Sequence, residues 1–374
     1  MAINYSAEKP LARLDLELPG LSSAEGRWIR LGPWYAMFPL EFAYEEIANN
    51  TAPGDAILDP FMGRGSTVVA AAALGRNAAG MEINPVAWVY AKTKINPAYK
   101  NKVLARLYDL AWLCEEKKLV RMQDFFHWAF DKEVLRFLLV AKDKLNWRYS
   151  QVDRTLMAII LVDLHGKESN SLSNQMRQTK AMAPDYSVNW WKARGMRPKE
   201  KDPISILEKK IEWRYRYGVP NFESKSNVLK GDSASMLYKV QKLAPFKLLL
   251  TSPPYYNVTN YNYDQWIRRW MLDGPPNPIN SAGRWENRFH GMEDYRYLLK
   301  SVFSKAAKYM VRDSRIVVRT DARQFTFDTT LDVLKTVFPD KSVEIIDRPY
   351  KGKTQTALFG DKSEKPGEKD IIMC

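Results

Sequence analysis

The chain from Phe246 to Tyr255 reads FKLLLTSPPY, an apolar run that ends in two consecutive prolines. The run predicts a buried strand, and the prolines end it because their φ is fixed and they lack a backbone N–H. A hydroxyl, two proline carbonyls and an aromatic ring stand together in the last four residues. These groups suit a planar ring that carries an exocyclic amine, and a strand that simply ends in a Pro-Pro turn is the alternative.

The N-terminal part of the chain alternates between strand and helix patterns. Residues 55–59 and 78–83 predict short buried strands that deliver a carboxylate at their ends, Asp59 and Glu82. Residues 61–67 read FMGRGST, a glycine-rich turn, and an alanine-rich helix is expected after it. A second helix is expected after the second strand. This order predicts the start of a parallel sheet.

Long helical periodicity replaces this alternation near residue 100 and continues to about residue 222. The strand pattern then resumes. Further strands are expected over residues 227–232, 246–251, 315–320 and 342–346, helices over 36–47 and 293–309, a hairpin at 354–360 and a charged loop at 361–369. We therefore expect an α/β fold in which residues 1–99 and 225–374 form one domain and residues 100–224 form a helical insertion.

The chain is strongly basic. Its 374 residues include 57 lysines and arginines and 43 aspartates and glutamates, a formal net charge of +14. Residues 171–218 have 11 basic and 5 acidic side chains, interleaved with tyrosines and tryptophans. This mixture suits contact with phosphates and stacking on bases, so nucleic acid is the expected partner, and a generally basic surface is the alternative.

Cys114 and Cys374 are the two cysteines of the chain, and their separation fits no zinc-ligand spacing. A disulfide framework and a metal site are therefore not expected, and the cytoplasm is the expected location. No apolar run is long enough to span a bilayer, and the N-terminus lacks the pattern of a secretion signal. We expect no membrane association.

Four predicted strands deliver polar side chains to one edge of the sheet, because the carboxyl ends of parallel strands meet there. The four polar side chains are those of Asp59, Glu82, Asp232 and Ser252. The turn at 61–67 lacks both the G-x-G-x-x-G spacing and the Gly-Lys-Ser/Thr of phosphate loops, which favours a nucleoside without a phosphate, such as S-adenosylmethionine (AdoMet). Glu82 would accept hydrogen bonds from its ribose. A solvated strand end is the alternative for Glu82, and a helix N-cap is the alternative for Asp232.

Two motifs, in this order, resemble those of the DNA amino-methyltransferases, which modify cytosine N4 or adenine N6. They are DPFMGRGST at 59–67 and TSPPY at 251–255, with further matching pieces at 34–39 (WYAMFP), Glu82 and 231–233 (GDS). The resemblance covers residues 27–98 and 226–359. It implies a Rossmann-like class I methyltransferase fold with a mostly parallel seven-stranded sheet, in which residues 1–99 carry the AdoMet-binding motif and residues 225–374 the SPPY motif.

The resemblance also implies roles for individual residues. AdoMet would contact Phe38, Pro39, Asp59, Phe61, Gly63, Gly65, Ser66, Thr67, Glu82 and Asp232. The catalytic residues would be Ser252, Pro253, Pro254 and Tyr255. The Ser252 hydroxyl and the Pro253 carbonyl would accept hydrogen bonds from the amine, and Tyr255 would stack on a base flipped out of the duplex. Ser252, in place of an aspartate or asparagine, favours cytosine N4 over adenine N6.

Target recognition is assigned provisionally to the insertion, because common serine-type enzymes often place the catalytic motif before the AdoMet motif and this chain reverses that order. The expected DNA contacts are Asn174, Arg177, Lys180, Trp190, Trp191, Lys192 and Arg194, with Asn257 and Tyr261 in a loop that closes over the base. Core packing of at least one ring is the alternative for the Trp190–Trp191 pair.

The expected function is therefore a sequence-specific methyltransferase of double-stranded DNA, with AdoMet as cofactor, in a restriction or phage-defence system. An adenine-N6 DNA enzyme, an RNA base methyltransferase and an inactive nucleic-acid-binding subunit are the alternatives. Methylation at carbon-5 of cytosine is not expected. It needs a cysteine nucleophile, and neither Cys114 nor Cys374 follows a proline in a turn.

Overall fold

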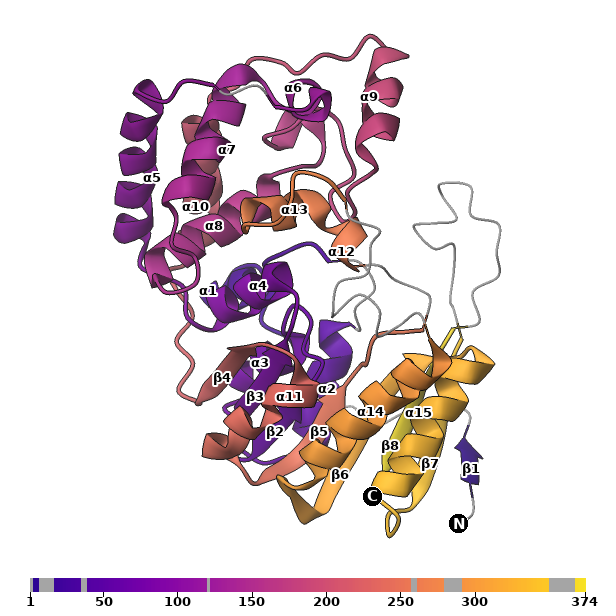
Figure 1. Ribbon diagram of the computed structural model, residues 1–374. Helices are drawn as coiled ribbons and strands as arrows, with labels where there is room; N and C mark the ends of the chain where they lie inside the picture. The colour runs from indigo at the N-terminus through magenta and orange to yellow at the C-terminus, as the bar shows by residue number, and fades with distance from the viewer. Residues whose placement is uncertain are drawn as a thin grey trace.

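The computed structural model describes residues 3–6, 17–34, 39–119, 122–256, 261–278, 291–349 and 367–374. These residues form one sheet of eight strands (Figure 1). In spatial order, the strands are β1 (Ile3–Ser6), β7 (Val343–Arg348), β8 (Glu368–Met373), β6 (Met310–Asp321), β5 (Phe246–Thr251), β2 (Ala56–Asp59), β3 (Asn77–Glu82) and β4 (Ser226–Lys230). All neighbours pair in parallel except β8, which is antiparallel to both β6 and β7.

The strand order reverses between β2 and β5. From β2 the chain moves outward through β3 to β4, and it then returns to place β5 on the other side of β2. The register pairs Ile57 with Leu248 and Leu58 with Leu249, so the carboxyl ends of β2 and β5 lie side by side. Open parallel sheets bind their ligands at such a reversal, because the connections leave the two strands toward opposite faces.

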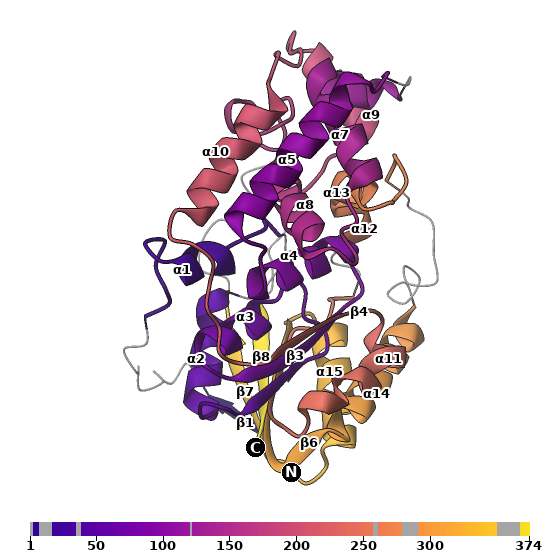
Figure 2. The same ribbon diagram turned by 90° about the vertical axis from the view of Figure 1, so that its left-hand side faces the viewer.

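Helices cover both faces of the sheet (Figures 1 and 2). Alternation along the strands explains the two layers: Ile57 and Leu248 belong to one hydrophobic core, and Leu58 and Leu249 belong to the other. The first core is covered by α1 (Ala24–Ile29), α2 (Leu40–Asn50), α3 (Ser66–Ala73) and α4 (Pro85–Ile95). The second is covered by α14 (Met292–Ala307), α15 (Gln324–Val337) and the 3₁₀ helix Leu237–Leu243, with the short α11 (Ser233–Met236) against α14.

A further group of helices lies at one end of the sheet (Figure 1). Its members are α5 (Lys100–Glu115), α6 (Asp124–Ala129), α7 (Lys132–Lys144), α8 (Gln151–Asp163), the 3₁₀ turn Glu168–Asn170, α9 (Pro184–Lys192) and α10 (Pro203–Tyr215). Two helices that follow β5, α12 (Tyr261–Asp264) and α13 (Trp266–Met271), join this group. Among the described residues, no helix combines the length and apolarity that crossing a membrane requires.

Arg268 of α13 explains why this later segment docks among the insertion helices. Its fully buried guanidinium donates to the Leu161 carbonyl at 2.8 Å, the Gln178 carbonyl at 2.5 Å and the Gln265 side chain at 2.8 Å. Trp266 adds an indole N–H bond of 3.0 Å to the Met182 carbonyl. The helical group is therefore built from two stretches of chain that flank β4 and β5 in sequence.

The α/β fold class predicted from the sequence is confirmed, with β1 as a strand that the sequence pattern did not predict. The predicted helix at 36–47 is observed as Leu40–Asn50, and residues 35–38 lie outside the described residues. The predicted hairpin at 354–360 also lies outside them.

The predicted loop at 361–369 is wrong at its C-terminal end, because Glu368 and Lys369 begin β8. The sequence pattern did not predict this strand because its first three residues are charged. Asp370 is fully buried within it, and it is stabilised by hydrogen bonds from Arg319 at 2.6 and 2.9 Å and from Arg348 at 2.8 Å. A central strand can therefore carry charge when its neighbours supply the counter-charge.

Candidate active site

The two sequence motifs meet at the strand reversal. Asp59 ends β2 and Thr251 ends β5, and the Thr251 hydroxyl donates to Asp59 Oδ1 at 2.6 Å. Burial raises the pKa of Asp59 to about 6, while the hydrogen bond from Thr251 acts in the opposite direction. The other carboxylate oxygen of Asp59 is buried and has no hydrogen-bond partner among the described residues. The motifs, which are 192 residues apart in the chain, are therefore joined by one buried bond.

The glycine turn between β2 and α3 needs its two glycines for different reasons. Both have a positive φ, +54° at Gly63 and +84° at Gly65. A Cβ at Gly65 would stand 2.8 Å from the Cβ of Ala91 in α4, so the helix packs directly against the backbone there. A Cβ at Gly63 would have no described neighbour within 4 Å. The turn is thus closely packed at Gly65 and open at Gly63.

Glu82 closes the other side of this turn from the end of β3. Its Oε2 accepts from the backbone N–H of Gly63 at 2.8 Å, and its Oε1 accepts from that of Asn84 at 2.6 Å. Burial raises the pKa of Glu82 to about 7, against the effect of these two hydrogen bonds. Each oxygen can still accept a second bond, and the residue is only half-buried, so the carboxylate can receive further hydroxyl donors.

The remaining predicted cofactor residues surround this turn. Ser66 and Thr67 are buried in the first turn of α3, and Phe61 packs edge-on against Phe303 with ring centroids 6.2 Å apart. The Asp232 carboxylate caps α11 through the N–H of Ala234 at 3.0 Å, which is the alternative considered for it. Pro39 stands exposed before α2. Phe38 lies outside the described residues.

These residues fit a nucleoside cofactor with a diol. Glu82 supplies carboxylate acceptors for two hydroxyls, the backbone at Gly63 is open to close approach, and Asp59 retains an unused buried acceptor. A phosphate would meet two carboxylates, while the arginine of the turn, Arg64, is buried and donates to the Gly32 carbonyl at 2.6 Å. Among the described residues, no three His, Cys, Asp or Glu side chains are grouped as metal ligands.

The Ser-Pro-Pro-Tyr motif follows β5 directly and makes one contact that the sequence pattern did not predict. The Tyr255 hydroxyl donates to Glu368 Oε1 of β8 at 2.8 Å and lies 3.4 Å from the Ser252 hydroxyl. Burial raises the pKa of Glu368, against the effect of the bond from Tyr255. No local signal marks Glu368, because only the pairing of β8 with β6 and β7 brings it to this edge.

The residues predicted to contact DNA do not form one surface. Trp191 is 1% exposed and donates to the Gln175 carbonyl at 2.8 Å, and Asn174 is 3% exposed and donates to the Trp128 carbonyl at 3.1 Å. The prediction of DNA contact is wrong for these two in this structure, because their polar atoms are used inside the helical group. Lys180 pairs with Asp264 at 2.7 Å.

Exposed or partly exposed positions among the predicted DNA contacts are Arg177, Trp190, Lys192 and Arg194. Asn257 lies outside the described residues, as does the side chain of Tyr261. The core alternative for the tryptophan pair therefore holds for Trp191, while Trp190 remains at the surface.

Comparison with known proteins agrees with the first motif. A family model described as DNA methylase, of the N6/N4 type, matches residues 18–93. The chain is 38% identical over 116 residues to the Type II methyltransferase M.MthZI of Methanothermobacter thermautotrophicus, which covers 31% of this chain and 29% of that protein. It is 25% identical over 241 residues to the Type II methyltransferase M.MvaI of Kocuria varians, which covers 58% of this chain and 50% of that protein. These alignments span half or less of each relative.

Solved structures add a more distant likeness. An rRNA methyltransferase, aviRa from Streptomyces viridochromogenes, aligns with 93% of this chain and 89% of its own, at a TM-score of 0.34 and 13% identity. The fold assignment therefore rests on the strand order and register described above. Residues 18–93 are thus similar to DNA methylases of the N6/N4 type, and the glycine turn within them lies beside the Ser-Pro-Pro-Tyr motif at adjoining strand ends.

Proposed function

We propose that this chain is a site-specific DNA methyltransferase that transfers a methyl group from AdoMet to the exocyclic N4 amine of cytosine in double-stranded DNA. The observation that carries the proposal is the bond between Thr251 and Asp59, because it joins the strand that leads into the Ser-Pro-Pro-Tyr motif to the strand that leads into the glycine turn. Methyl transfer needs the amine and the methyl donor within van der Waals reach and aligned, and adjoining strand ends supply that arrangement.

The chemistry that the residues must perform follows from the amine. The N4 lone pair of cytosine is delocalised into the ring, so the amine is a poor nucleophile. Hydrogen bonds accepted by the Ser252 hydroxyl and the Pro253 carbonyl favour a pyramidal nitrogen, and they stabilise the positive charge that develops as the nitrogen attacks. AdoMet, when bound, supplies the methyl group on a sulfonium centre. The amine can lose its proton after the transfer, so no strong base is required.

The target base must leave the duplex to reach this edge of the sheet. Unstacking costs about a few kcal/mol, and a stacking partner at the new position offsets part of it. Tyr255 supplies that partner, and its hydrogen bond to Glu368 fixes the direction of the ring. We assign base flipping and direct in-line transfer to this site on these grounds.

Charge and relatives support duplex DNA as the substrate. The formal charge of +14 suits a polyanion, and the relatives M.MthZI and M.MvaI are named as Type II methyltransferases. We therefore place the chain in a restriction-modification or defence system, where its methyl mark protects the host DNA from a cognate nuclease.

Nucleoside analysis tests the proposal. Purified protein is incubated with tritiated AdoMet and either duplex DNA or RNA, and the digested nucleosides are separated by mass spectrometry. We expect label in N4-methylcytosine from DNA. Ser252→Ala should lower turnover at least about tenfold, the size of one lost transition-state hydrogen bond, with little change in AdoMet affinity.

The same experiment has outcomes that contradict the proposal. Label only in N6-methyladenine would move the target to adenine, and label only in RNA would replace the substrate. AdoMet binding with no transfer to any nucleic acid would indicate an inactive binding subunit.

A further inference from the structure

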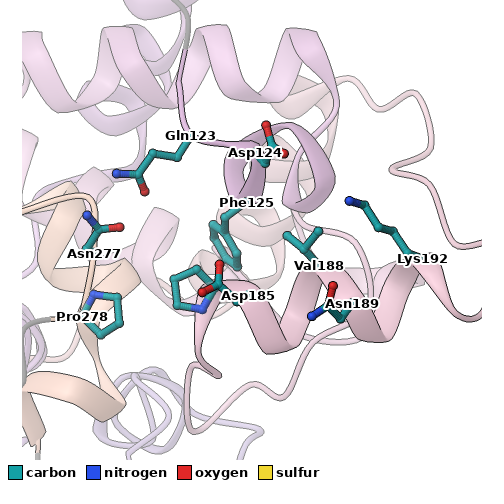
Figure 3. A pocket seen from close by; sticks show the side chains of 10 residues that line it. Gln123, Asp124, Phe125, Asp185, Val188, Asn189, Lys192, Asn277 and Pro278 are labelled. Carbon is teal, nitrogen blue, oxygen red and sulfur yellow. The ribbon is translucent and has the colours of Figure 1, made fainter.

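A polar pocket of about 620 Å³ lies in the helical group (Figure 3). Three segments form its walls: the start of α6, the exposed side of α9, and the chain after α13. The lining residues include Gln123, Asp185, Asn189, Lys192 and Asn277. The amides of Gln123 and Asn277 stand on one side of the pocket and Lys192 on the other. The helical insertion and the chain that follows α13 therefore both contribute to this pocket.

The hydrogen-bonding groups of this pocket are available to a ligand. The carboxamides of Gln123, Asn189 and Asn277 are exposed, and none makes a hydrogen bond with another described residue. Phe125 and Val188, which are 3% and 7% exposed, give the pocket an apolar floor. A carboxamide presents a donor and an acceptor in one plane, which matches the N6/N7 edge of adenine in the major groove.

Charge decides which part of a nucleic acid can enter. Asp124 and Asp185 line the pocket together with one cation, Lys192, and the two carboxylates disfavour a phosphate between them. The same carboxylates can accept a hydrogen bond from the exocyclic amine of cytosine. The interior of the pocket therefore suits base edges and not the sugar-phosphate backbone.

Basic side chains that suit contact with the DNA backbone lie beside the pocket. Arg197 lies 3.7 Å from the centroid of the Trp128 ring, and Arg194 lies 4.3 Å from that of Trp190. Lys192 lies 5.5 Å from the Trp128 ring and also lines the pocket. The aromatic faces orient these side chains but do not neutralise them, and none pairs with a carboxylate among the described residues. Phosphate contacts that position a duplex need such cations.

The segment before α9 contacts a residue that lies shortly after the catalytic motif in the sequence. Asp264, nine residues after Tyr255, accepts from the backbone N–H of Ala181 at 2.8 Å and pairs with Lys180 at 2.7 Å. Ala181 lies three residues before α9, which carries one wall of the pocket. Nine extended residues span at most about 31 Å, which limits the separation of Asp264 from Tyr255. The pocket and the catalytic motif are therefore within reach of a single DNA site.

We infer that this pocket reads the major-groove edges of base pairs that flank the methylated base, while Arg194 and Arg197 hold the adjacent phosphates. The inference rests on the proposed function, since it assumes a duplex DNA substrate. It assigns recognition to Gln123, Asn189 and Asn277 in place of the buried Asn174 and Trp191.

Two sets of variants test the inference. Wild type, Gln123→Ala, Asn189→Ala and Asn277→Ala methylate a randomised duplex library, and the methylated sequences are determined. Each amide variant should lower the discrimination at one flanking position by about 5- to 150-fold, the range for one base contact. Arg194→Ala and Arg197→Ala should instead weaken binding to every duplex and lower the slope of log affinity against log salt by about 1 each.

Matched controls separate these effects from general damage. Asn101→Ala removes an exposed amide on α5, and Lys199→Ala removes a lysine that Glu168 already pairs at 3.3 Å. Neither should change the sequence profile, and Lys199→Ala should reduce the salt slope less than Arg194→Ala. Amide variants that keep the wild-type sequence profile would overturn the inference. A wild type that methylates no duplex at all would instead overturn the proposed function.

Discussion

Two carboxyl groups, Asp59 and Glu82, end the neighbouring strands β2 and β3, and burial raises the pKa of both, to about 6 and about 7. The folded protein therefore binds these protons more tightly than the unfolded chain does. The stability that results is complete below the unfolded pKa of about 4 and is lost as the pH rises through the two folded values. The ribose binding expected of Glu82 would have the opposite dependence, because an ionised carboxylate accepts more hydrogen bonds than a protonated one.

We predict that AdoMet binds about tenfold more weakly at pH 6 than at pH 8, as expected when binding requires ionisation of a group with a pKa of about 7. Isothermal titration calorimetry at the two pH values measures this. Glu82→Gln should bind weakly at both, whereas Asp59→Asn should keep the pH dependence. Equal wild-type affinity at pH 6 and pH 8 would exclude Glu82 as the ribose acceptor.

The hydrogen bond between Tyr255 and Glu368 gives a second prediction at the level of single residues. Tyr255→Phe keeps the aromatic ring for stacking but removes its hydrogen bond to Glu368. We expect kcat to fall about tenfold, because one hydrogen bond to a charged group is lost. Tyr255→Ala should lower kcat further because stacking is lost as well.

A double-mutant cycle tests whether the effect passes through Glu368. Glu368→Leu combined with Tyr255→Phe should be no slower than Tyr255→Phe alone, because both changes remove the same bond. Additive losses in kcat would show that the two residues act independently.

The turn between β2 and α3 depends on close packing of its backbone against α4. Gly65→Ala should destabilise the protein by about 2–4 kcal/mol, from the left-handed φ together with the 2.8 Å approach to Ala91. Gly54→Ala is the matched control, because its φ is also positive, at +89°, and no described atom lies within 4 Å of the added Cβ. Urea unfolding should show the control losing only about 1–2 kcal/mol, and equal losses would contradict the close approach.

Element types were largely predictable because they depend on local patterns. The apolar runs of β2, β3 and β5 are contiguous, and the prolines and glycines that end them act within a few residues. β8 was not predictable in this way, because its charged residues are stabilised only by Arg319 and Arg348 on other strands. In α9, the spacing of Val188 and Trp191 does carry a signal for a buried face, which the basic composition of the segment obscured.

At the scale of the whole molecule, Arg268 joins the two stretches that build the helical group. Arg268→Leu leaves two carbonyls and one amide oxygen unsatisfied in the interior, and it should cost at least about 3 kcal/mol. Chemical denaturation measures this loss. Lys100→Leu, which breaks the exposed ion pair with Glu212 at 2.6 Å, is the control and should change stability by less than about 1 kcal/mol. Similar losses in both variants would show that Arg268 does not hold the group together.

The positions of Asp59, Glu82 and Ser252 at strand ends follow from short-range chemistry, since a strand stops where its apolar residues give way to polar or proline residues. The meeting of these ends at the strand reversal, the arrival of Glu368 beside Tyr255 and the burial of Asn174 and Trp191 do not follow from it. Those features depend on pairings between residues far apart in the chain. A pairing of that kind depends on the packing and counter-charges of the entire fold, which no local stretch of residues contains.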